Sequence, residues 1–277
     1  MPDGVRLSGV IESPRNERIR RYRRLLKRNF RYRERKFLVE GLQCVSEALV
    51  HPSRPECLIC DEKGLNALEA YSDIVADRGI PVFQAQPAVM ACLTTAVTPQ
   101  GVLAVMPMLD VDLAALLESA ASTLVIADRV RDPGNLGSMM RAADAAGAGG
   151  MVVCAESADP YNPKTVRGTA GSIFHLPHSV GHDMRDAVTA LRERGFTIIA
   201  AHPHAGTEHW DFTWPERMAL VLGNEAWGIP REDEELLDDL VRVPILGRAE
   251  SLNVAAAAAV LLYEVERVRR MGRRSTD

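Results

Sequence analysis

Polar residues able to bind a substrate gather in three loops that follow predicted strands. The predicted strand TLVIA (123–127) is followed by the segment DRVRDPGNLGSMMRAADAAG. The predicted strand MALVLG (218–223) is followed by NEAWGIP, and the predicted strand VRVPIL (241–246) is followed by GRAESLN. Ligands of open parallel sheets bind at the carboxyl ends of the strands, so we look for chemistry in these loops. The candidates are Asn135, Arg141, Glu225, Ser251 and Asn253.

Each candidate also has an ordinary structural explanation. Asn135 is placed to cap the helix predicted over 135–147, and Ser251 and Asn253 stand at the start of an alanine-rich helix. Arg141 lies two turns into its helix, a common place for a surface arginine. The negative charge of Glu225 would favour the start of the acidic helix predicted over 231–239. Taken singly, these residues leave capping and ligand binding both open.

Several common catalytic motifs are missing from the sequence. No G-x-G-x-x-G follows the first strand of the C-terminal half, and no G-x-x-x-x-G-K-[ST], H-E-x-x-H or G-x-S-x-G occurs. The five cysteines show no framework spacing, and the pair Cys57 and Cys60 lacks a second pair to complete a zinc site. We therefore predict structural thiols and no metal.

The net charge of −4 is unevenly distributed, because one short segment is strongly basic. Residues 15–36 hold twelve lysines and arginines against two glutamates, a net of +10, so the rest of the chain carries −14. Such a concentration of cations predicts contact with RNA. The predicted contacts are Arg20, Arg21, Arg23, Arg24, Lys27, Arg28, Arg31 and Arg33.

Aromatic residues interrupt this basic segment. Tyr22, Phe30 and Tyr32 could stack on unpaired bases. The alternative is a solvated helix over about 15–28 whose Ile19, Leu25 and Leu26 pack inward while its arginines face water.

The order of elements predicts an α/β protein with two domains. Residues 1–106 alternate helices and short strands, residues 107–120 form a linker, and residues 121–277 alternate again. The strands of the second domain are nearly continuous apolar runs, as expected for a parallel sheet that is buried on both faces. The alanine helix from Ser251 is apolar around most of its circumference up to Leu262, which predicts burial on nearly all sides.

Targeting signals are not evident in the sequence. No apolar run approaches the roughly 20 residues that span a bilayer, and the first residues lack the apolar region of a signal peptide. Reduced thiols and these features predict a cytoplasmic protein without a membrane partner.

The loops and the basic segment together resemble one family. DPGNLGSMMRAADAAG, LGNEAWGIP (222–230) and VPILGRAESLN (243–253) are similar, in order and interval, to the three motifs of the SpoU/TrmH branch of the SPOUT RNA methyltransferases. NPKTVRGTAGSIFHLP (162–177) resembles the middle region of that family. SPRNERIRRYRRLLKRNFRYRERKFLVEGLQCVSEAL resembles its N-terminal substrate-binding domain, whose fold is like that of certain ribosomal RNA-binding proteins.

The resemblance implies a fold, a cofactor and an assembly. The fold would be a SPOUT domain with a C-terminal trefoil knot and a parallel sheet, preceded by a smaller α/β RNA-binding domain. The cofactor would be S-adenosylmethionine, held mostly by backbone groups of the knot loops, and the protein would be a homodimer. By position in the motifs, the cofactor-binding residues would be Leu222, Gly223, Val243, Ile245 and Leu252.

The implied reaction is methyl transfer to a ribose 2′-hydroxyl of RNA, with ribosomal RNA favoured by the separate N-terminal domain. A guanidinium stays protonated in proteins, so we assign Arg141 to the target phosphate and the developing alkoxide and not to the base role. The amides and hydroxyl of Asn135, Asn253 and Ser251 would orient the ribose, and Glu225 would brace Arg141 or the knot. Two alternatives stay open: a transfer RNA 2′-O-methyltransferase, and a non-catalytic RNA-binding protein of the same fold.

Overall fold

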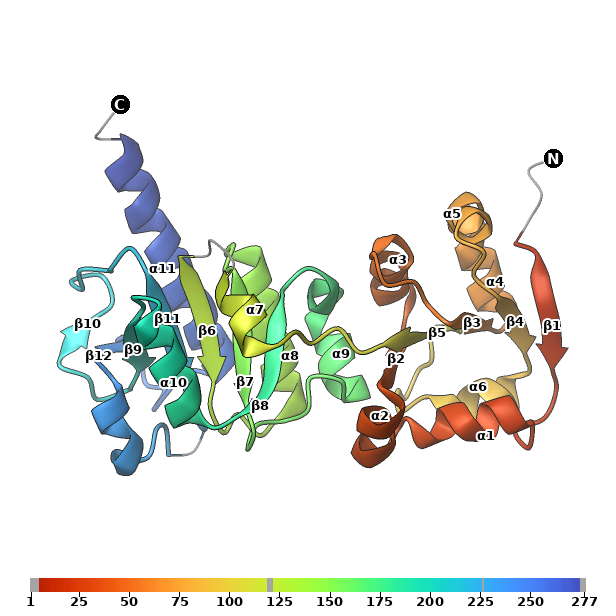
Figure 1. Cartoon of the computed structure of the whole chain (residues 1–277), viewed down its shortest axis with the longest axis horizontal. Helices are drawn as coiled ribbons and strands as arrows, with labels where there is room; N and C mark the ends of the chain where they lie inside the picture. The colour runs from red at the N-terminus through yellow and green to blue at the C-terminus, as the bar shows by residue number, and fades with distance from the viewer. Residues whose placement is uncertain (1–4, 119–121, 226, 275–277) are drawn as a thin grey trace. The chain divides into compact units, whose positions relative to one another are not determined.

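The computed structural model describes residues 5–118, 122–225 and 227–274 (Figure 1). The chain folds into two compact units. One contains Met1–Leu109 with Asp159–Phe174, and the other contains Asp110–Ala158 with His175–Asp277. The division at Leu109 falls within the predicted linker 107–120, whose last two residues lie outside the described part of the chain. Residues 159–174, which sequence resemblance groups with the C-terminal motifs, pack with the N-terminal unit.

The N-terminal unit is built on a five-stranded mixed sheet with strand order β1-β4-β3-β5-β2. Strands β1, β4 and β3 are parallel, and β5 is antiparallel to both β3 and β2. The strands are β1 (Leu7–Ile11), β2 (Lys36–Glu40), β3 (Cys57–Cys60), β4 (Val82–Ala85) and β5 (Val102–Pro107). The helices are α1 (Glu17–Arg24), α2 (Arg28–Glu34), α3 (Leu42–Val50), α4 (Glu62–Leu68), η1 (Glu69–Tyr71), α5 (Ser72–Asp77), α6 (Pro87–Leu93), α9 (Pro163–Thr169) and η2 (Ser172–Phe174).

The cysteines of this unit are structural, as predicted. Cys57 and Cys60 are fully buried in β3, and none of the chain's cysteines forms a disulfide. Burial raises the pKa of Cys57 to about 11 and that of Cys60 to about 12, so both thiols stay protonated at neutral pH. Within the described residues, no cluster of three histidine, cysteine or acidic side chains could hold a metal ion.

The basic segment forms two helices instead of the single helix predicted over 15–28. Helix α1 ends at Arg24, Lys27 is extended, and α2 begins at Arg28. Ile19 and Leu25 are buried in the core, as the inward-packing alternative expected. The break has a structural consequence, because the second helix can then turn Arg31 into the interior.

Arg31 is a buried cation and not a surface one. Its side chain is 2% exposed and pairs with Asp159, to which its Nε donates at 3.0 Å, while one terminal nitrogen donates to the carbonyl of Leu25 at 2.8 Å. Tyr32 also donates to Asp159, at 3.2 Å. The guanidinium is therefore committed inside the unit, and we correct the sequence prediction by removing Arg31 from the residues expected to touch RNA.

Arg31→Ala should destabilise the N-terminal unit by about 3–5 kcal/mol, because it leaves the buried carboxylate of Asp159 without its cation. Urea unfolding followed by far-ultraviolet circular dichroism measures the change in the free energy of unfolding. Arg21→Ala is the matched control, since the Arg21–Glu34 pair at 3.0 Å is exposed and should matter far less. Equal losses for the two variants would contradict a stabilising role for the buried pair.

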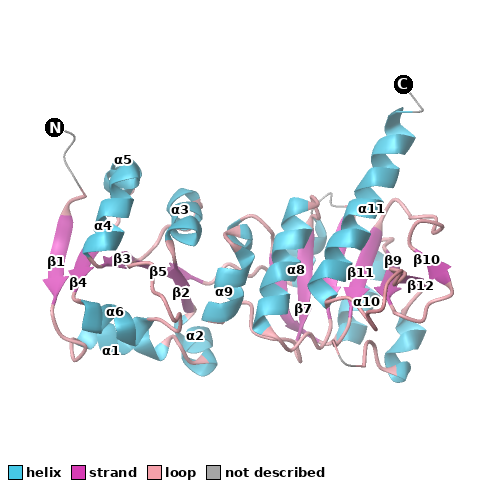
Figure 2. Cartoon of the chain, turned by 180° about the vertical axis from the view of Figure 1, so that it is seen from behind, coloured by secondary structure: helices cyan, strands magenta, loops and turns pink. Residues whose placement is uncertain are grey.

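The C-terminal unit contains a seven-stranded sheet that is parallel throughout, as predicted, with order β10-β12-β9-β11-β6-β7-β8. Figures 1 and 2 show α7 and α10 on one face and α8 and α11 on the other. The strands are β6 (Thr123–Ala127), β7 (Gly150–Cys154), β8 (His178–His182), β9 (Thr197–Ala201), β10 (Thr207–Glu208), β11 (Met218–Leu222) and β12 (Asp239–Arg242). The helices are α7 (Leu113–Glu118), α8 (Pro133–Ala145), α10 (Met184–Glu193), η3 (Arg231–Leu236) and α11 (Val254–Arg274).

Three expectations for this unit were wrong in detail. The acidic helix predicted over 231–239 is the shorter 3₁₀ helix η3, and the strand predicted over 241–246 is β12, which ends at Arg242. The alanine helix α11 begins at Val254 and is not buried on nearly all sides. Ala258 and Leu261 are buried, whereas Val260 and Tyr263 are exposed. None of the described helices is both long enough and apolar enough to cross a membrane.

Candidate active site

Two of the loops that carry the candidate residues meet because β6 and β11 are neighbours in the parallel sheet. Ala127 and Leu222, the last residues of these strands, are register partners. The loops after them therefore leave the sheet side by side. Helix α8 starts in the first loop, and its N-cap is Asp132, which accepts a hydrogen bond from the backbone of Asn135 at 2.9 Å. The prediction that Asn135 caps this helix was wrong, and its side chain is free for other contacts.

A chain of hydrogen bonds joins one residue from each of the three loops. Asn253 donates through Nδ2 to Oδ1 of Asn135 at 2.8 Å, across 118 positions of sequence. Asn135 donates through its own Nδ2 to Oε1 of Glu225 at 2.8 Å, across 90 positions. The fold thus brings together three of the five predicted catalytic residues through direct contacts between side chains.

Asn253 combines this contact with the capping role. Its Oδ1 accepts hydrogen bonds from the backbone of Ala255 at 2.9 Å and of Ala256 at 3.3 Å, at the start of α11. The same amide therefore caps the helix with its oxygen and contacts Asn135 with its nitrogen. Capping and site formation are not alternatives at this position.

Glu225 braces the first loop. Its carboxylate accepts from Asn135 and, at 3.4 Å each, from the backbone N–H groups of Arg131 and Asp132. Partial burial raises its pKa, but these hydrogen bonds outweigh burial and the net pKa is lowered. A carboxylate that stays ionised and is engaged by several donors suits bracing better than proton uptake. Glu225 therefore braces Asn135 and its loop, and not Arg141.

The other two predicted catalytic residues lie on the surface. Arg141 is exposed on α8, whose Leu136, Met139 and Met140 form the buried stripe as predicted. Ser251 is exposed in the segment that precedes α11. Their side chains are available to a ligand.

The predicted cofactor residues divide into two groups. Leu222 is buried at the end of β11, and Gly223 starts a tight loop in which Asn224 and Gly228 exchange backbone hydrogen bonds of 2.9 Å. A Cβ atom on Gly223 would lie 2.6 Å from the carbonyl oxygen of Gly228, so only glycine fits. Ala226 of this loop lies outside the described residues.

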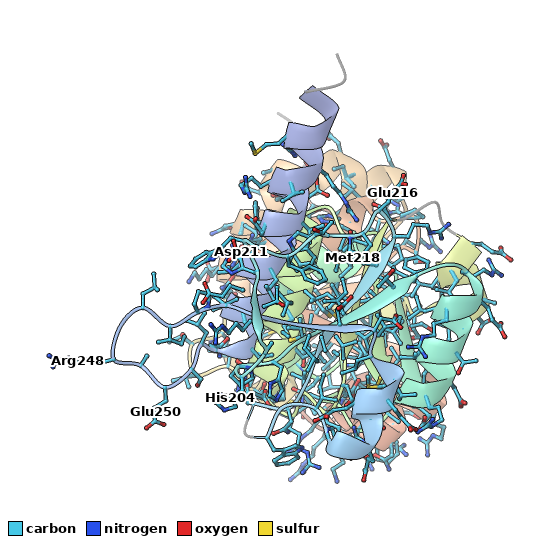
Figure 3. All side chains as sticks on the ribbon, turned by 90° about the vertical axis from the view of Figure 1, so that its left-hand side faces the viewer. His204, Asp211, Glu216, Met218, Arg248 and Glu250 are labelled. Carbon is cyan, nitrogen blue, oxygen red and sulfur yellow. The ribbon has the colours of Figure 1, made fainter. Side chains whose placement is uncertain are left out.

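The second group belongs to the loop before α11. Val243 is half-buried, whereas Ile245 and Leu252 are 36% and 41% exposed. Figure 3 shows Arg248 and Glu250 at the outer edge of this projecting loop. Exposed apolar side chains and a compact glycine loop are features that suit an adenine nucleoside, which needs apolar walls and backbone hydrogen bonds.

The basic helices of the N-terminal unit present most of their cations to solvent. Arg20, Arg23 and Arg28 are exposed, and so are Arg21, Arg24, Lys27 and Arg33. The guanidiniums of Arg24 and Arg33 lie 4.0 and 4.5 Å from the ring centre of Phe30.

The other two aromatic residues are less available to bases. Tyr22 is buried and donates to Glu56 at 2.8 Å, so its predicted stacking on bases was wrong. Tyr32 is half-buried and donates to Asp159. Phe30, between two arginines, is the aromatic residue best placed among cations.

Comparison with known proteins identifies the family. Residues 122–263 match the SpoU rRNA Methylase family, and residues 16–104 match the MRM3-like substrate binding domain. The chain belongs to the SpoU rRNA methylase family, as its motifs predicted. It is a methyltransferase, and its methyl donor is S-adenosylmethionine.

Individual relatives cover nearly the whole chain. A 23S rRNA (guanosine(2553)-2′-O)-methyltransferase, RlmP from Bacillus subtilis, is 35% identical over 92% of this chain and 98% of its own. A 23S rRNA (uridine(2479)-2′-O)-methyltransferase from Streptomyces viridochromogenes is 35% identical over 95% of this chain and 93% of its own. The AdoMet-bound rRNA methyltransferase from Sinorhizobium meliloti superposes with a TM-score of 0.82 at 32% identity, covering 94% of this chain and 98% of its own.

Proposed function

We propose that this enzyme transfers a methyl group from S-adenosylmethionine to a ribose 2′-hydroxyl of ribosomal RNA. The observation that carries the proposal is the hydrogen-bonded series Asn253–Asn135–Glu225, which joins the three motif loops beside Gly223. The relatives from Bacillus subtilis and Streptomyces viridochromogenes act on 2′-oxygens of 23S rRNA, which favours ribosomal RNA over transfer RNA and an enzyme over a non-catalytic binding protein.

We propose the following division of labour at this site. S-adenosylmethionine supplies an electrophilic methyl group, and Leu222, Gly223, Val243, Ile245 and Leu252 would hold it. A sugar hydroxyl is a poor nucleophile at neutral pH, so its oxygen must be positioned and its developing charge stabilised. Arg141, exposed and always cationic, would bind the target phosphate and that charge. Asn135, Asn253 and Ser251 would orient the ribose, with Glu225 holding Asn135 in place.

We assign RNA binding outside the site to the N-terminal unit. Its exposed cations Arg20, Arg21, Arg23, Arg24, Lys27, Arg28 and Arg33 would neutralise phosphates, with Phe30 as an aromatic surface. The unit matches a substrate-binding domain, which supports the assignment. We keep the proposed domains at 1–106 and 121–277, with residues 159–174 packing against the first.

The C-terminal segment is proposed to form a trefoil knot and part of a dimer interface. Strand β12 is separated from β6 by β9 and β11, yet α11, which follows β12, packs against α8, which follows β6. This path across the sheet supports a knot. The exposed Val260, Tyr263 and Leu246 offer apolar surface that a second copy would cover. We place the enzyme in the cytoplasm, in keeping with the bacterial relatives that act on ribosomal RNA.

Transfer of labelled methyl groups tests the substrate class. Purified enzyme is incubated with tritiated S-adenosylmethionine and, separately, with protein-free 23S rRNA, 16S rRNA and bulk transfer RNA from a strain that lacks the gene. We expect ribosomal RNA to be labelled at a ribose 2′-oxygen. Label confined to transfer RNA, or to a base, would overturn the proposal.

Gly223→Val should abolish cofactor binding, because its side chain would collide with the carbonyl of Gly228 at the turn of the loop. Isothermal titration with S-adenosylmethionine measures the effect. Gly206→Val is the matched control, because a Cβ atom there would meet nothing within 4 Å. Wild-type affinity in a folded Gly223→Val protein would show that this loop does not hold the cofactor.

A further inference from the structure

Arg129, which neither the motifs nor the proposed mechanism uses, has a conformation that glycine usually adopts. It follows Asp128 directly after β6, and its φ is +53°. A residue with a Cβ atom is strained in this left-handed region and needs support from its surroundings. Such strained positions cluster at functional sites, so the surroundings of Arg129 are informative.

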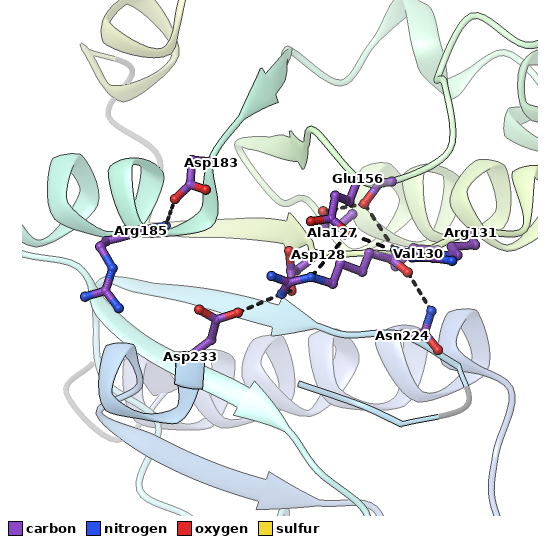
Figure 4. Close-up of polar contacts among 11 residues, drawn as sticks. Ala127, Asp128, Val130, Arg131, Glu156, Asp183, Arg185, Asn224 and Asp233 are labelled. Carbon is purple, nitrogen blue, oxygen red and sulfur yellow. Dashed lines mark hydrogen bonds and ion pairs between the residues drawn. The ribbon is translucent and has the colours of Figure 1, made fainter. Parts of the chain in front are cut away.

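The side chain of Arg129 is surrounded by carboxylates from three separate segments. One terminal nitrogen lies 2.7 Å from Asp128 and 2.7 Å from Asp233 of η3, and Nε lies 3.6 Å from Glu156, which follows β7. Figure 4 labels Asp128, Glu156 and Asp233 within this group of polar contacts. The Arg129 side chain is only 19% exposed, and those of Asp128 and Asp233 are 3% and 13% exposed. These contacts are therefore stronger than surface ion pairs.

The backbone of the same residue contacts the cofactor loop. The carbonyl of Arg129 accepts a hydrogen bond from Nδ2 of Asn224 at 2.9 Å. Asn224 follows Gly223 directly, and Asp233 lies shortly after Pro230 at the other end of the loop. Arg129 thus holds the start of the loop through its carbonyl and the end through its guanidinium.

Removing the Arg129 guanidinium would leave the carboxylates around it repelling one another. Asp128 and Asp233 both contact the same nitrogen, so without it two poorly solvated carboxylates would face each other. Movement of η3 away from β6 would relieve this repulsion. Glu225 lies in the loop between the two points of attachment, so that movement would also disturb the brace on Asn135.

We propose that Arg129 is a positioning residue that clamps Asn224 and Asp233 and so shapes the S-adenosylmethionine pocket. The inference rests on the proposed location of that pocket. It assigns to Arg129 no contact with the reacting atoms. Its effect should appear first in cofactor affinity, and only secondarily in turnover.

Arg129→Ala tests the clamp against Arg185→Ala as a matched control. Arg185 pairs with Glu235 on the same η3 segment, also at 2.7 Å, but both side chains are more than half exposed. We expect Arg129→Ala to raise the Kd and the KM for S-adenosylmethionine by about tenfold. Arg185→Ala should leave both within about twofold of wild type, since exposed pairs contribute little.

Two further variants separate the clamp from general stability. Arg129→Gly relieves the strain at φ +53° while removing the side chain, so it should melt at a higher temperature than Arg129→Ala and still bind S-adenosylmethionine weakly. Asp233→Asn should weaken cofactor binding too. Adding it to Arg129→Ala should cause no further loss, because the contact is already gone and one of the two opposed carboxylates is then neutral.

The outcomes are distinct. Wild-type cofactor affinity in Arg129→Ala and Arg129→Gly, or equal losses in Arg185→Ala, would overturn the clamp. A cofactor affinity that follows the melting temperature across the series would also overturn it, by showing a purely structural role. Cofactor affinity is measured without RNA. A wild-type protein that binds S-adenosylmethionine but methylates no ribosomal RNA would therefore contradict the proposed substrate, and not the clamp.

Discussion

Arg141→Ala should lower methyl transfer by about 10²–10³-fold while leaving S-adenosylmethionine affinity within about twofold of wild type. The residue is exposed on α8, so its loss removes little packing and should not unfold the protein. The expected loss comes from the transition state, where negative charge grows on the 2′-oxygen and a fixed cation stabilises it. The kcat measured at saturating RNA and cofactor checks this result.

Two controls sharpen the Arg141 experiment. Arg194→Ala removes another exposed arginine from the same unit, beyond α10, and should leave kcat unchanged. Arg141→Lys keeps the charge but not the planar fork that binds phosphate through two hydrogen bonds, so it should recover part of the activity. Near-normal turnover by folded Arg141→Ala would remove Arg141 from the mechanism.

Asn253→Asp should reduce kcat by about 10²-fold with little loss of stability. Aspartate can cap α11 as asparagine does, accepting from Ala255 and Ala256. It cannot donate to Oδ1 of Asn135, so the link at 2.8 Å is replaced by two oxygens in opposition. The position of Asn135 relative to Asn253 should therefore change, while α11 keeps its N-terminal cap. Steady-state kinetics and thermal melting of the same preparation measure the two effects separately.

Asn253→Ala provides the comparison that capping alone would predict. It removes the cap as well as the link, and should cost about 1 kcal/mol of stability in addition to the loss of turnover. If Asn253→Asp were as active as wild type and only Asn253→Ala were impaired, capping would account for the residue. The bond to Asn135 would then have no catalytic consequence.

The strands of the C-terminal unit could be predicted because burial on both faces leaves a simple signal. TLVIA, TIIAA and MALVL are uninterrupted apolar runs, and β6, β9 and β11 coincide with them almost residue for residue. Strand β8, HSVGH, has no such run and was not predicted. Strand β1, LSGVI, lies at a sheet edge and is mostly exposed, so its pattern was equally weak.

The motifs indicated residues that the fold brings together, but their contacts could not be predicted. The motifs indicated Asn135, Glu225 and Asn253. They did not show that Asp132, three residues before Asn135, caps α8 in its place. Arg31 gave no sign of burial in a run of arginines, because its partner Asp159 lies 128 positions away. Charged residues inside a fold are stabilised by distant partners, and local patterns do not show them.

A crystal structure with S-adenosylmethionine bound is the most direct test of the account. It should place the ligand against the backbone of Gly223 and the side chain of Leu252, with the methyl group on the side of Asn135 and Arg141. Ligand density in any other part of the protein, with the loops 223–230 and 243–253 left empty, would contradict the account.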